Sequence, residues 1–186
     1  MILAVALLAA ARETPLGAVE VGGTTLPDAI EVAGHPLPLN GAAVLTRLVF
    51  KVYAAALYLP APAHSVEEAL KPDAPRAFVM HFLREVSREK LVAAMQQGFE
   101  TNAGQEAARA STEIARLLEV VKSMKSGDRL TFTYDPESGS TVTMTDGTVA
   151  RFPGRDFADA FLLLWLGPHP PRQDMKRALL AGGGDR

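Results

Sequence analysis

Apolar and polar residues alternate along several stretches of the chain, and this alternation has the period of β-strands. In residues 77–83, which are almost entirely apolar, Phe78, Met80 and Phe82 recur at every second position and would share one side of a strand. Residues 130–152 repeat the pattern with two turn sequences in between, which predicts a three-stranded antiparallel meander. Two shorter strand-like pieces, residues 19–21 and 29–33, are bounded by the Gly and Pro residues typical of hairpins.

Other segments carry apolar residues at helical spacing. They are Arg88–Asn102, Gln105–Met124, Phe157–Leu166 and about Gln173–Leu180. A shorter helix is predicted to begin at the capping sequence Ser65-Val66-Glu67-Glu68 and to end before Pro72. Strands, helices, strands and helices follow one another without repeated crossovers. This order predicts an α+β fold with a mainly antiparallel sheet.

The longest apolar run after the N-terminus lies at residues 43–59 and is rich in Val, Phe and Tyr, which favours strand. Its length predicts a bent strand or two consecutive strands, with the bend at Ala54-Ala55-Ala56. Under strict alternation, Leu48, Phe50 and Val52 form a uniformly apolar face that we expect in the core. The opposite face mixes cations with apolar groups and is expected to line a groove. Its members are Leu45, Arg47, Val49, Lys51 and Tyr53.

The composition narrows the classes of function. A chain of 186 residues, 48% of them apolar, suffices for one domain with a full core, which we expect to act as a monomer. The formal net charge of −2 offers no basic excess for binding nucleic acid. The absence of cysteine excludes disulfides and thiolate metal sites, and the four histidines lack the spacing of a zinc site on a helix. We therefore predict no metal and no cofactor.

The N-terminal segment Met1–Ala11 reads MILAVALLAAA. Its apolar run is too short to span a bilayer, so no stable membrane insertion is expected, but it matches the apolar core of a secretory signal. Ala9 and Ala11 supply a small-x-small cleavage pattern, although no Lys or Arg precedes the run. We interpret residues 1–11 as a signal peptide and residues 12–186 as a single periplasmic or secreted domain. The alternative is a buried N-terminal helix.

Three segments taken together resemble the bacterial chalcone isomerase-like family, and their order and spacing agree over Leu37–Leu180. They are Leu39-Asn40-Gly41-Ala42 followed by Phe50–Pro60, His81–Ser87 followed by Lys90-Leu91, and Phe152–Phe157 followed by Trp165-Leu166-Gly167. The resemblance implies an open-faced β-sandwich, in which helices cover one side of a large antiparallel sheet and a ligand cleft lies between them.

The resemblance also implies where the plant chalcone isomerases would carry their catalytic groups. Their arginine falls on Leu45 and their strand threonine on Tyr53. Their helical Tyr and Asn fall near Ser87 and Ala94, and their late threonine falls near Leu164. Leu45 cannot stabilise an anion, and Ala94 and Leu164 offer no side-chain hydrogen bond. We therefore expect no cyclisation of chalcones.

Fatty-acid-binding members of the family hold a carboxylate with an arginine and a tyrosine. Tyr53 matches that tyrosine, whereas the arginine position is again Leu45. Arg47 lies about 7 Å farther along the strand and could replace the arginine if the strand carries a bulge.

The sequence thus favours a non-catalytic protein that binds a small apolar or fatty-acid-like ligand. The residues expected to line its site are Tyr53, Arg47, Leu45, Lys51, Ala94 and Leu164. Two alternatives stay open. One is an enzyme of the intramolecular lyase or isomerase type, acting on an unknown substrate in the same cleft. The other is a structural or interaction module whose cleft has collapsed.

Overall fold

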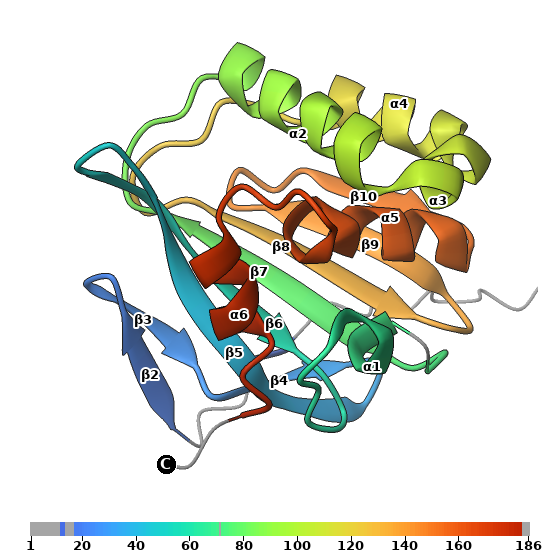
Figure 1. Ribbon diagram of the computed structural model, residues 1–186, viewed down its shortest axis with the longest axis horizontal. Helices are drawn as coiled ribbons and strands as arrows, with labels where there is room; N and C mark the ends of the chain where they lie inside the picture. The colour runs from blue at the N-terminus through green and yellow to red at the C-terminus, as the bar shows by residue number, and fades with distance from the viewer. Residues whose placement is uncertain (1–11, 14–16, 71, 184–186) are drawn as a thin grey trace, which may run out of the picture.

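The computed structural model describes residues 12–13, 17–70 and 72–183. They form a large antiparallel sheet with helices stacked on one face and a small two-stranded sheet packed on the other (Figure 1). This arrangement confirms the predicted α+β fold and the open-faced β-sandwich. The segment Met1–Ala11, interpreted above as a signal peptide, lies outside the described residues.

The large sheet has eight strands in the order β1-β4-β5-β6-β7-β8-β9-β10. They are β1 (Arg12–Glu13), β4 (Ala29–Val32), β5 (His35–Arg47), β6 (Phe50–Tyr58), β7 (Arg76–Phe82), β8 (Arg129–Asp135), β9 (Gly139–Met144) and β10 (Val149–Phe152). The small sheet pairs β2 (Ala18–Val21) with β3 (Thr24–Pro27). The predicted three-stranded meander is confirmed as β8, β9 and β10.

Six helices occur among the described residues. They are α1 (Val66–Leu70), α2 (Arg88–Asn102), α3 (Gly104–Arg109), α4 (Ser111–Val120), α5 (Arg155–Leu166) and α6 (Gln173–Leu179). The single helix predicted over Gln105–Met124 is wrong. The backbone breaks at Ala110, which is buried, and the break lets Arg109 meet Asp156 of α5 at 2.8 Å. At its far end Met124 leaves the helix and pairs with Val86 in a β-bridge.

Stacked aromatic rings hold α5 against the sheet. Three strands each place one phenylalanine beneath one aromatic residue of α5, and these α5 residues are spaced four apart, one helical turn. The pairs and their ring-centroid distances are Phe152–Phe157 at 4.3 Å, Phe132–Phe161 at 4.2 Å and Phe78–Trp165 at 4.3 Å. Residues four apart lie on one face of a helix, so a single face of α5 contacts β7, β8 and β10 in turn, with β9 between the last two. Stacked aromatic pairs add stability beyond the area they bury.

A second, smaller core lies on the opposite face of the sheet. Leu26 of β3 and Ile30 of β4 are buried there against Ala54, Ala56 and Tyr58 of β6. The hydroxyl of Tyr58 donates a hydrogen bond of 2.9 Å to the carbonyl oxygen of Pro27. The small alanines of β6 therefore lie within a strand packed on both faces and do not mark a bend.

The long apolar run is two strands joined by a tight hairpin, so one of the two forms predicted for it is confirmed. The turn falls at Leu48 and Val49 rather than at the alanines. Leu48, Val49 and Phe50 are 95%, 82% and 53% exposed, so the expected core face of Leu48, Phe50 and Val52 is wrong at its first two positions. Strict alternation fails here because a turn interrupts the strand.

The Leu39-Asn40-Gly41 sequence anchors the C-terminal helix to β5. A register shift leaves Asn40 unpaired with β6, and its buried amide group bonds to the backbone of Ala63 and to the carbonyl oxygen of Leu179. A Cβ atom at Gly41 would lie 2.1 Å from the carbonyl oxygen of Ala178. Only glycine allows the end of α6 to approach the strand this closely.

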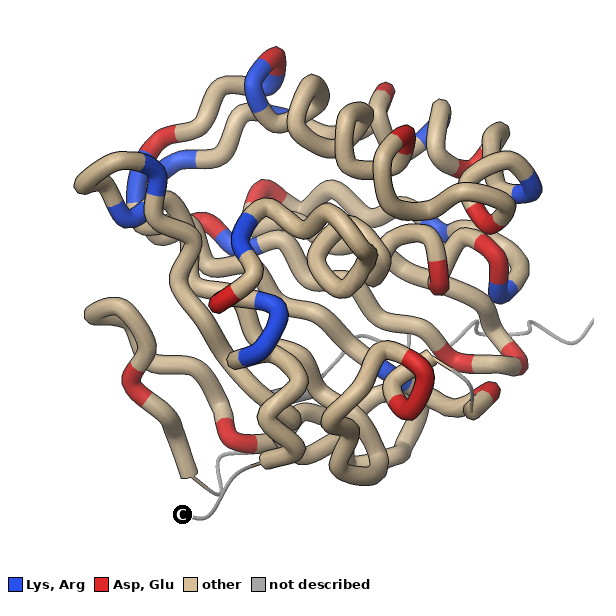
Figure 2. The backbone as a smooth tube through the Cα atoms, viewed as in Figure 1, with Lys and Arg blue, Asp and Glu red and all other residues tan. Residues whose placement is uncertain are grey.

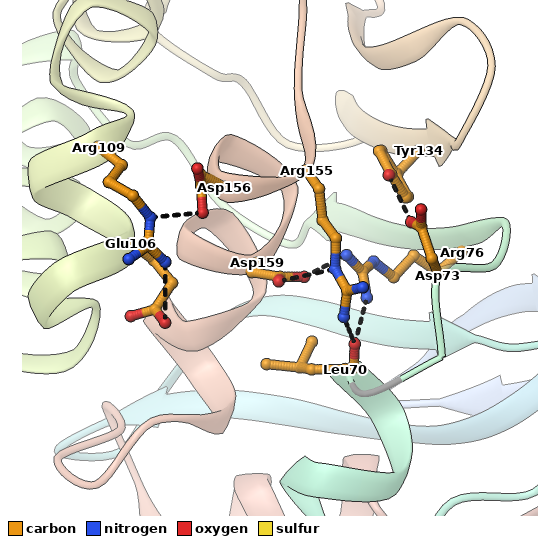
Figure 3. A network of polar contacts seen from close by, with 9 residues as sticks. All are labelled: Leu70, Asp73, Arg76, Glu106, Arg109, Tyr134, Arg155, Asp156 and Asp159. Carbon is orange, nitrogen blue, oxygen red and sulfur yellow. Dashed lines mark hydrogen bonds and ion pairs between the residues drawn. The ribbon is translucent and has the colours of Figure 1, made fainter.

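A buried charge network links the N-terminal half of α5 to the sheet (Figure 3). Arg76 of β7 is only 1% exposed and forms an ion pair with Asp159 of α5. Arg155 donates to the same carboxylate at 3.2 Å, and both arginines donate to the carbonyl oxygen of Leu70. The guanidinium of Arg76 also lies 4.8 Å from the ring centroid of Tyr134. Burial lowers the pKa of Arg76, and the charge of Asp159 opposes that shift.

Candidate functional site

A cavity of about 770 Å³ lies between α2 and the ends of β5, β6 and β7 that adjoin the β5–β6 hairpin. The segment that follows α5 closes one side of it. Most of the cavity wall is apolar, and its apolar members include Leu45, Val52, Met80, Phe82, Leu91, Met95 and Leu164. Polar and charged side chains lie mainly at its exposed rim. We refer to this cavity as the cleft.

The floor of the cleft is one row of side chains across three strands. Leu45 of β5 pairs with Tyr53 of β6, and Tyr53 pairs with Phe82 of β7. All three are buried, and the rings of Tyr53 and Phe82 lie 5.7 Å apart. The sequence therefore places one phenol in an otherwise apolar floor.

A β-bulge in β6 decides which of its side chains reach the cleft. Leu45 pairs with Tyr53 but Thr46 pairs with Lys51, so Val52 is an extra residue on β6. Val52 joins Tyr53 on the cleft side, and the alternation beyond it is inverted.

The expected position of Lys51 in the groove is corrected by this bulge. Its ammonium group donates a hydrogen bond of 3.2 Å to the carbonyl oxygen of Gly22, on the face of the sheet opposite the cleft. Phe50, which was expected on the core face of the strand, lines the cleft instead. On β5 the alternation continues unchanged, so Arg47 stays on the same side as Leu45 and lines the cleft rim. The bulge that would let Arg47 replace the arginine was expected in its own strand, but the bulge lies on β6, and Arg47 pairs with Phe50 rather than lying beside Tyr53.

Tyr53 is oriented by a tryptophan. The indole N–H of Trp165 donates a hydrogen bond of 2.8 Å to the Tyr53 hydroxyl oxygen. Because an indole can only donate, the hydroxyl proton of Tyr53 points elsewhere. Burial raises the pKa of Tyr53 to about 12, although the Trp165 hydrogen bond and the positive charge of Arg47 both lower it. Tyr53 is thus a neutral hydrogen-bond donor at physiological pH.

Three cations surround the cleft mouth. Arg47, Arg84 and Lys90 line it, and Glu85 is the only carboxylate among the described lining residues. Arg84 lies over the ring of Phe50, with its guanidinium carbon 4.6 Å from the ring centroid. The side chain of Arg47 makes no ion pair or hydrogen bond with any described residue. The mouth therefore favours an anionic or strongly polar group.

The roof and the side wall depend on close helix packing. Ala94 and Gly98 of α2 line the cleft together with Leu164 of α5. A Cβ atom at Gly98 would lie 2.6 Å from the Cδ2 atom of Leu164, so glycine permits this contact. Asn102 at the end of α2 exchanges two hydrogen bonds with the backbone of His169, at 2.7 and 3.0 Å. This clamp holds the side wall in place.

Five of the six residues expected at the site line the cleft, and Lys51 does not. The five are Leu45, Arg47, Tyr53, Ala94 and Leu164. Sequence reasoning did not predict that Trp165 orients Tyr53. The available signal was that the only tryptophan of the chain follows Leu164 directly on an apolar helix. Asn102 was missed as well, because its bond to His169 joins residues 67 positions apart.

Residues 18–181 match the family described as chalcone isomerase-like, and this match covers most of the chain. The protein therefore belongs to the chalcone isomerase-like family. Among solved structures, it is similar to a fatty-acid-binding protein of Arabidopsis thaliana. The TM-score is 0.66 at 13% sequence identity, and the likeness covers 90% of this chain and 97% of the other. At that identity the likeness shows a shared fold.

A search of curated protein sequences found no match. Within the described residues, no helix is long and apolar enough to cross a membrane. The same residues hold no group of three or more His, Asp or Glu side chains able to bind a metal ion.

Proposed function

We propose that this protein binds a fatty acid or a similar single-chain amphiphile in the cleft, without chemical conversion. The observation that carries the proposal is the Tyr53 hydroxyl. It is buried in an apolar floor, its oxygen is occupied by Trp165, and its proton is available to a ligand. A polar group of this kind inside an apolar pocket fixes the orientation of a ligand.

The head group is expected to be a carboxylate. A carboxylate oxygen accepts a hydrogen bond from a neutral phenol, and Arg47 is near enough for its charge to affect the pKa of Tyr53. An arginine that makes no bond to a described residue can pair with the ligand at no loss of an internal contact. Leu45 then contacts the first methylenes rather than the charge.

The apolar tail is expected to fill the rest of the cleft. A volume of about 770 Å³ falls inside the range of about 300–1,000 Å³ typical of small-molecule pockets. The wall formed by Met80, Phe82, Leu91 and Met95 offers no charged partner to a ligand, which suits an alkyl chain. The similar protein of Arabidopsis thaliana is a fatty-acid-binding protein, which agrees with this proposal.

Removal of the proposed head-group contacts should weaken binding measurably. We expect Arg47→Ala to lower the affinity for palmitate about tenfold or more, because a charge-assisted hydrogen bond is worth about 1.5–3 kcal/mol. Tyr53→Phe should cost less, because the neutral hydroxyl forms an ordinary hydrogen bond of about 0.5–1.5 kcal/mol. Isothermal titration calorimetry with purified protein and palmitate measures both effects.

Lys51→Ala is the matched control, because it removes a cation four residues from Arg47 on the opposite face of the sheet. It should leave the affinity for palmitate unchanged. Equal losses from Arg47→Ala and Lys51→Ala would show a nonspecific effect of charge and contradict a carboxylate site at Arg47.

We also propose that the domain acts in the periplasm or outside the cell, after removal of Met1–Ala11. The support is the apolar core of that segment and its Ala-x-Ala end. N-terminal sequencing of protein from its own host should give a chain that begins near Arg12. An intact Met1 on the soluble protein would contradict export.

A further inference from the structure

Exposed apolar side chains gather at one point of the surface. Four large hydrophobic residues are exposed among the described residues, and three of them are consecutive: Leu48, Val49 and Phe50. They form the tip of the hairpin between β5 and β6. Scattered single apolar residues are ordinary on a protein surface, whereas a contiguous group marks an interaction site.

The backbone conformation at the tip is unfavourable for the leucine at position 48. Leu48 has a φ angle of +56°. This left-handed region suits Gly, Asn or Asp in a tight hairpin turn, and a bulky residue there is uncommon. The tip thus carries an apolar side chain where folding alone would favour a small or polar one.

Cations flank the apolar tip. Arg47 precedes it, Lys51 follows it, and Arg84 is held over the ring of Phe50 at 4.6 Å. Figure 2 shows several Lys and Arg residues gathered at this end of the molecule. An apolar point surrounded by positive charge complements a bilayer with anionic head groups, because the point enters the interface while the cations meet phosphates.

The tip also adjoins the cleft mouth. Phe50 and Arg47 belong both to the flanked tip and to the cleft lining. A bilayer in contact with Leu48 and Val49 would therefore face the mouth, and an alkyl chain could move between bilayer and cleft without crossing water.

We propose that the β5–β6 hairpin docks this protein reversibly on anionic lipid bilayers, with Leu48 and Val49 inserted into the interface. This inference goes beyond the proposed function, since ligand binding in solution does not require a membrane. A lipid surface suits the tip because the tip combines apolar side chains with flanking cations, whereas a protein partner would need a broader apolar area.

Cosedimentation of the full chain with phospholipid vesicles tests the proposal. The protein should bind vesicles that contain phosphatidylglycerol more strongly than vesicles of phosphatidylcholine alone, and high salt should weaken the binding. The double variant Leu48→Asn and Val49→Ser should lower partitioning by about tenfold or more, because two apolar side chains no longer enter the interface. Val149→Ser is the matched control, since Val149 is 45% exposed but lies on β10.

A second measurement locates the contact. The chain has no cysteine, so Val49→Cys accepts a single environment-sensitive dye, which should shift to shorter wavelength on anionic vesicles. A dye at Val149→Cys should not shift. The proposal is overturned if the wild type ignores anionic vesicles, if the tip variant binds as well as the wild type, or if the dye at position 49 keeps its spectrum. Analytical ultracentrifugation tests whether the tip binds a second copy of the chain instead. A dimeric wild type and a monomeric tip variant would overturn the proposal.

The affinity for soluble palmitate, measured without vesicles, separates the two proposals. Normal palmitate binding with no vesicle binding would contradict only the proposal that the hairpin docks on membranes. Vesicle binding without palmitate binding would contradict only the proposal that the cleft binds a fatty acid.

Discussion

Asp159→Ala is expected to lower the free energy of unfolding by about 3–5 kcal/mol, the range found when one partner of a buried ion pair is removed. The reason is the environment of Arg76, which is 1% exposed and would keep its charge without the carboxylate that pairs with it. The carbonyl of Leu70 and the ring of Tyr134 would remain as its contacts, and neither carries a countercharge. Urea unfolding followed by circular dichroism measures the loss.

Asp156→Ala supplies the control on the same helix. Asp156 pairs with Arg109 at 2.8 Å, but the two side chains are 46% and 50% exposed, so solvent screens the pair and its loss should lower the stability far less. The double variant Arg76→Met with Asp159→Leu should recover much of the stability, because no charge is left buried. Similar losses from Asp159→Ala and Asp156→Ala would contradict the view that burial makes the Arg76 pair sensitive.

The second large effect concerns the length of the ligand. Each methylene moved from water into the cleft should contribute about 0.8 kcal/mol, or roughly a fourfold gain in affinity. Across a series of saturated fatty acids, the affinity should rise steadily until the cavity of about 770 Å³ is full and then level off. Titration calorimetry below the critical micelle concentration of each ligand measures both the slope and the plateau.

Ala94→Trp tests whether the alkyl chain occupies the cleft. Ala94 lines the cavity from α2, and a large ring there should shorten the chain length at which the affinity levels off. The slope at shorter lengths should not change. An affinity that does not change with chain length would contradict the proposal that the alkyl chain lies in the apolar cleft. A normal slope with no effect of Arg47→Ala would keep the pocket and indicate a neutral ligand.

Local patterns determined the strands, most helices and the order of the elements. The predicted bounds of Arg88–Asn102 agree with α2, because apolar spacing and the capping Ser87 both act within one or two turns. The split of the helix predicted over Gln105–Met124 was not visible, since the break falls at Ala110, which is buried in the core, and burial of one residue is not evident from local spacing.

The sequence by itself identified the fold, the apolar groove and the pair of Tyr53 and Arg47 as candidates. Tertiary structure decided which side chains reach the groove. One extra residue in β6, Val52, inverts the alternation, so it turns Lys51 away and brings Phe50 to the mouth. A period-two pattern cannot reveal such a bulge, because the register of β6 against β5 depends on the pairing of the two strands.

The orientation of Tyr53 was likewise decided by the folded chain. Its partner Trp165 lies 112 residues away and reaches it only because stacked rings fix α5 across the sheet. Sequence therefore determined which chemical groups the protein carries, through interactions between near neighbours. The direction in which the phenol of Tyr53 donates its proton follows from packing between distant segments, which no local pattern encodes.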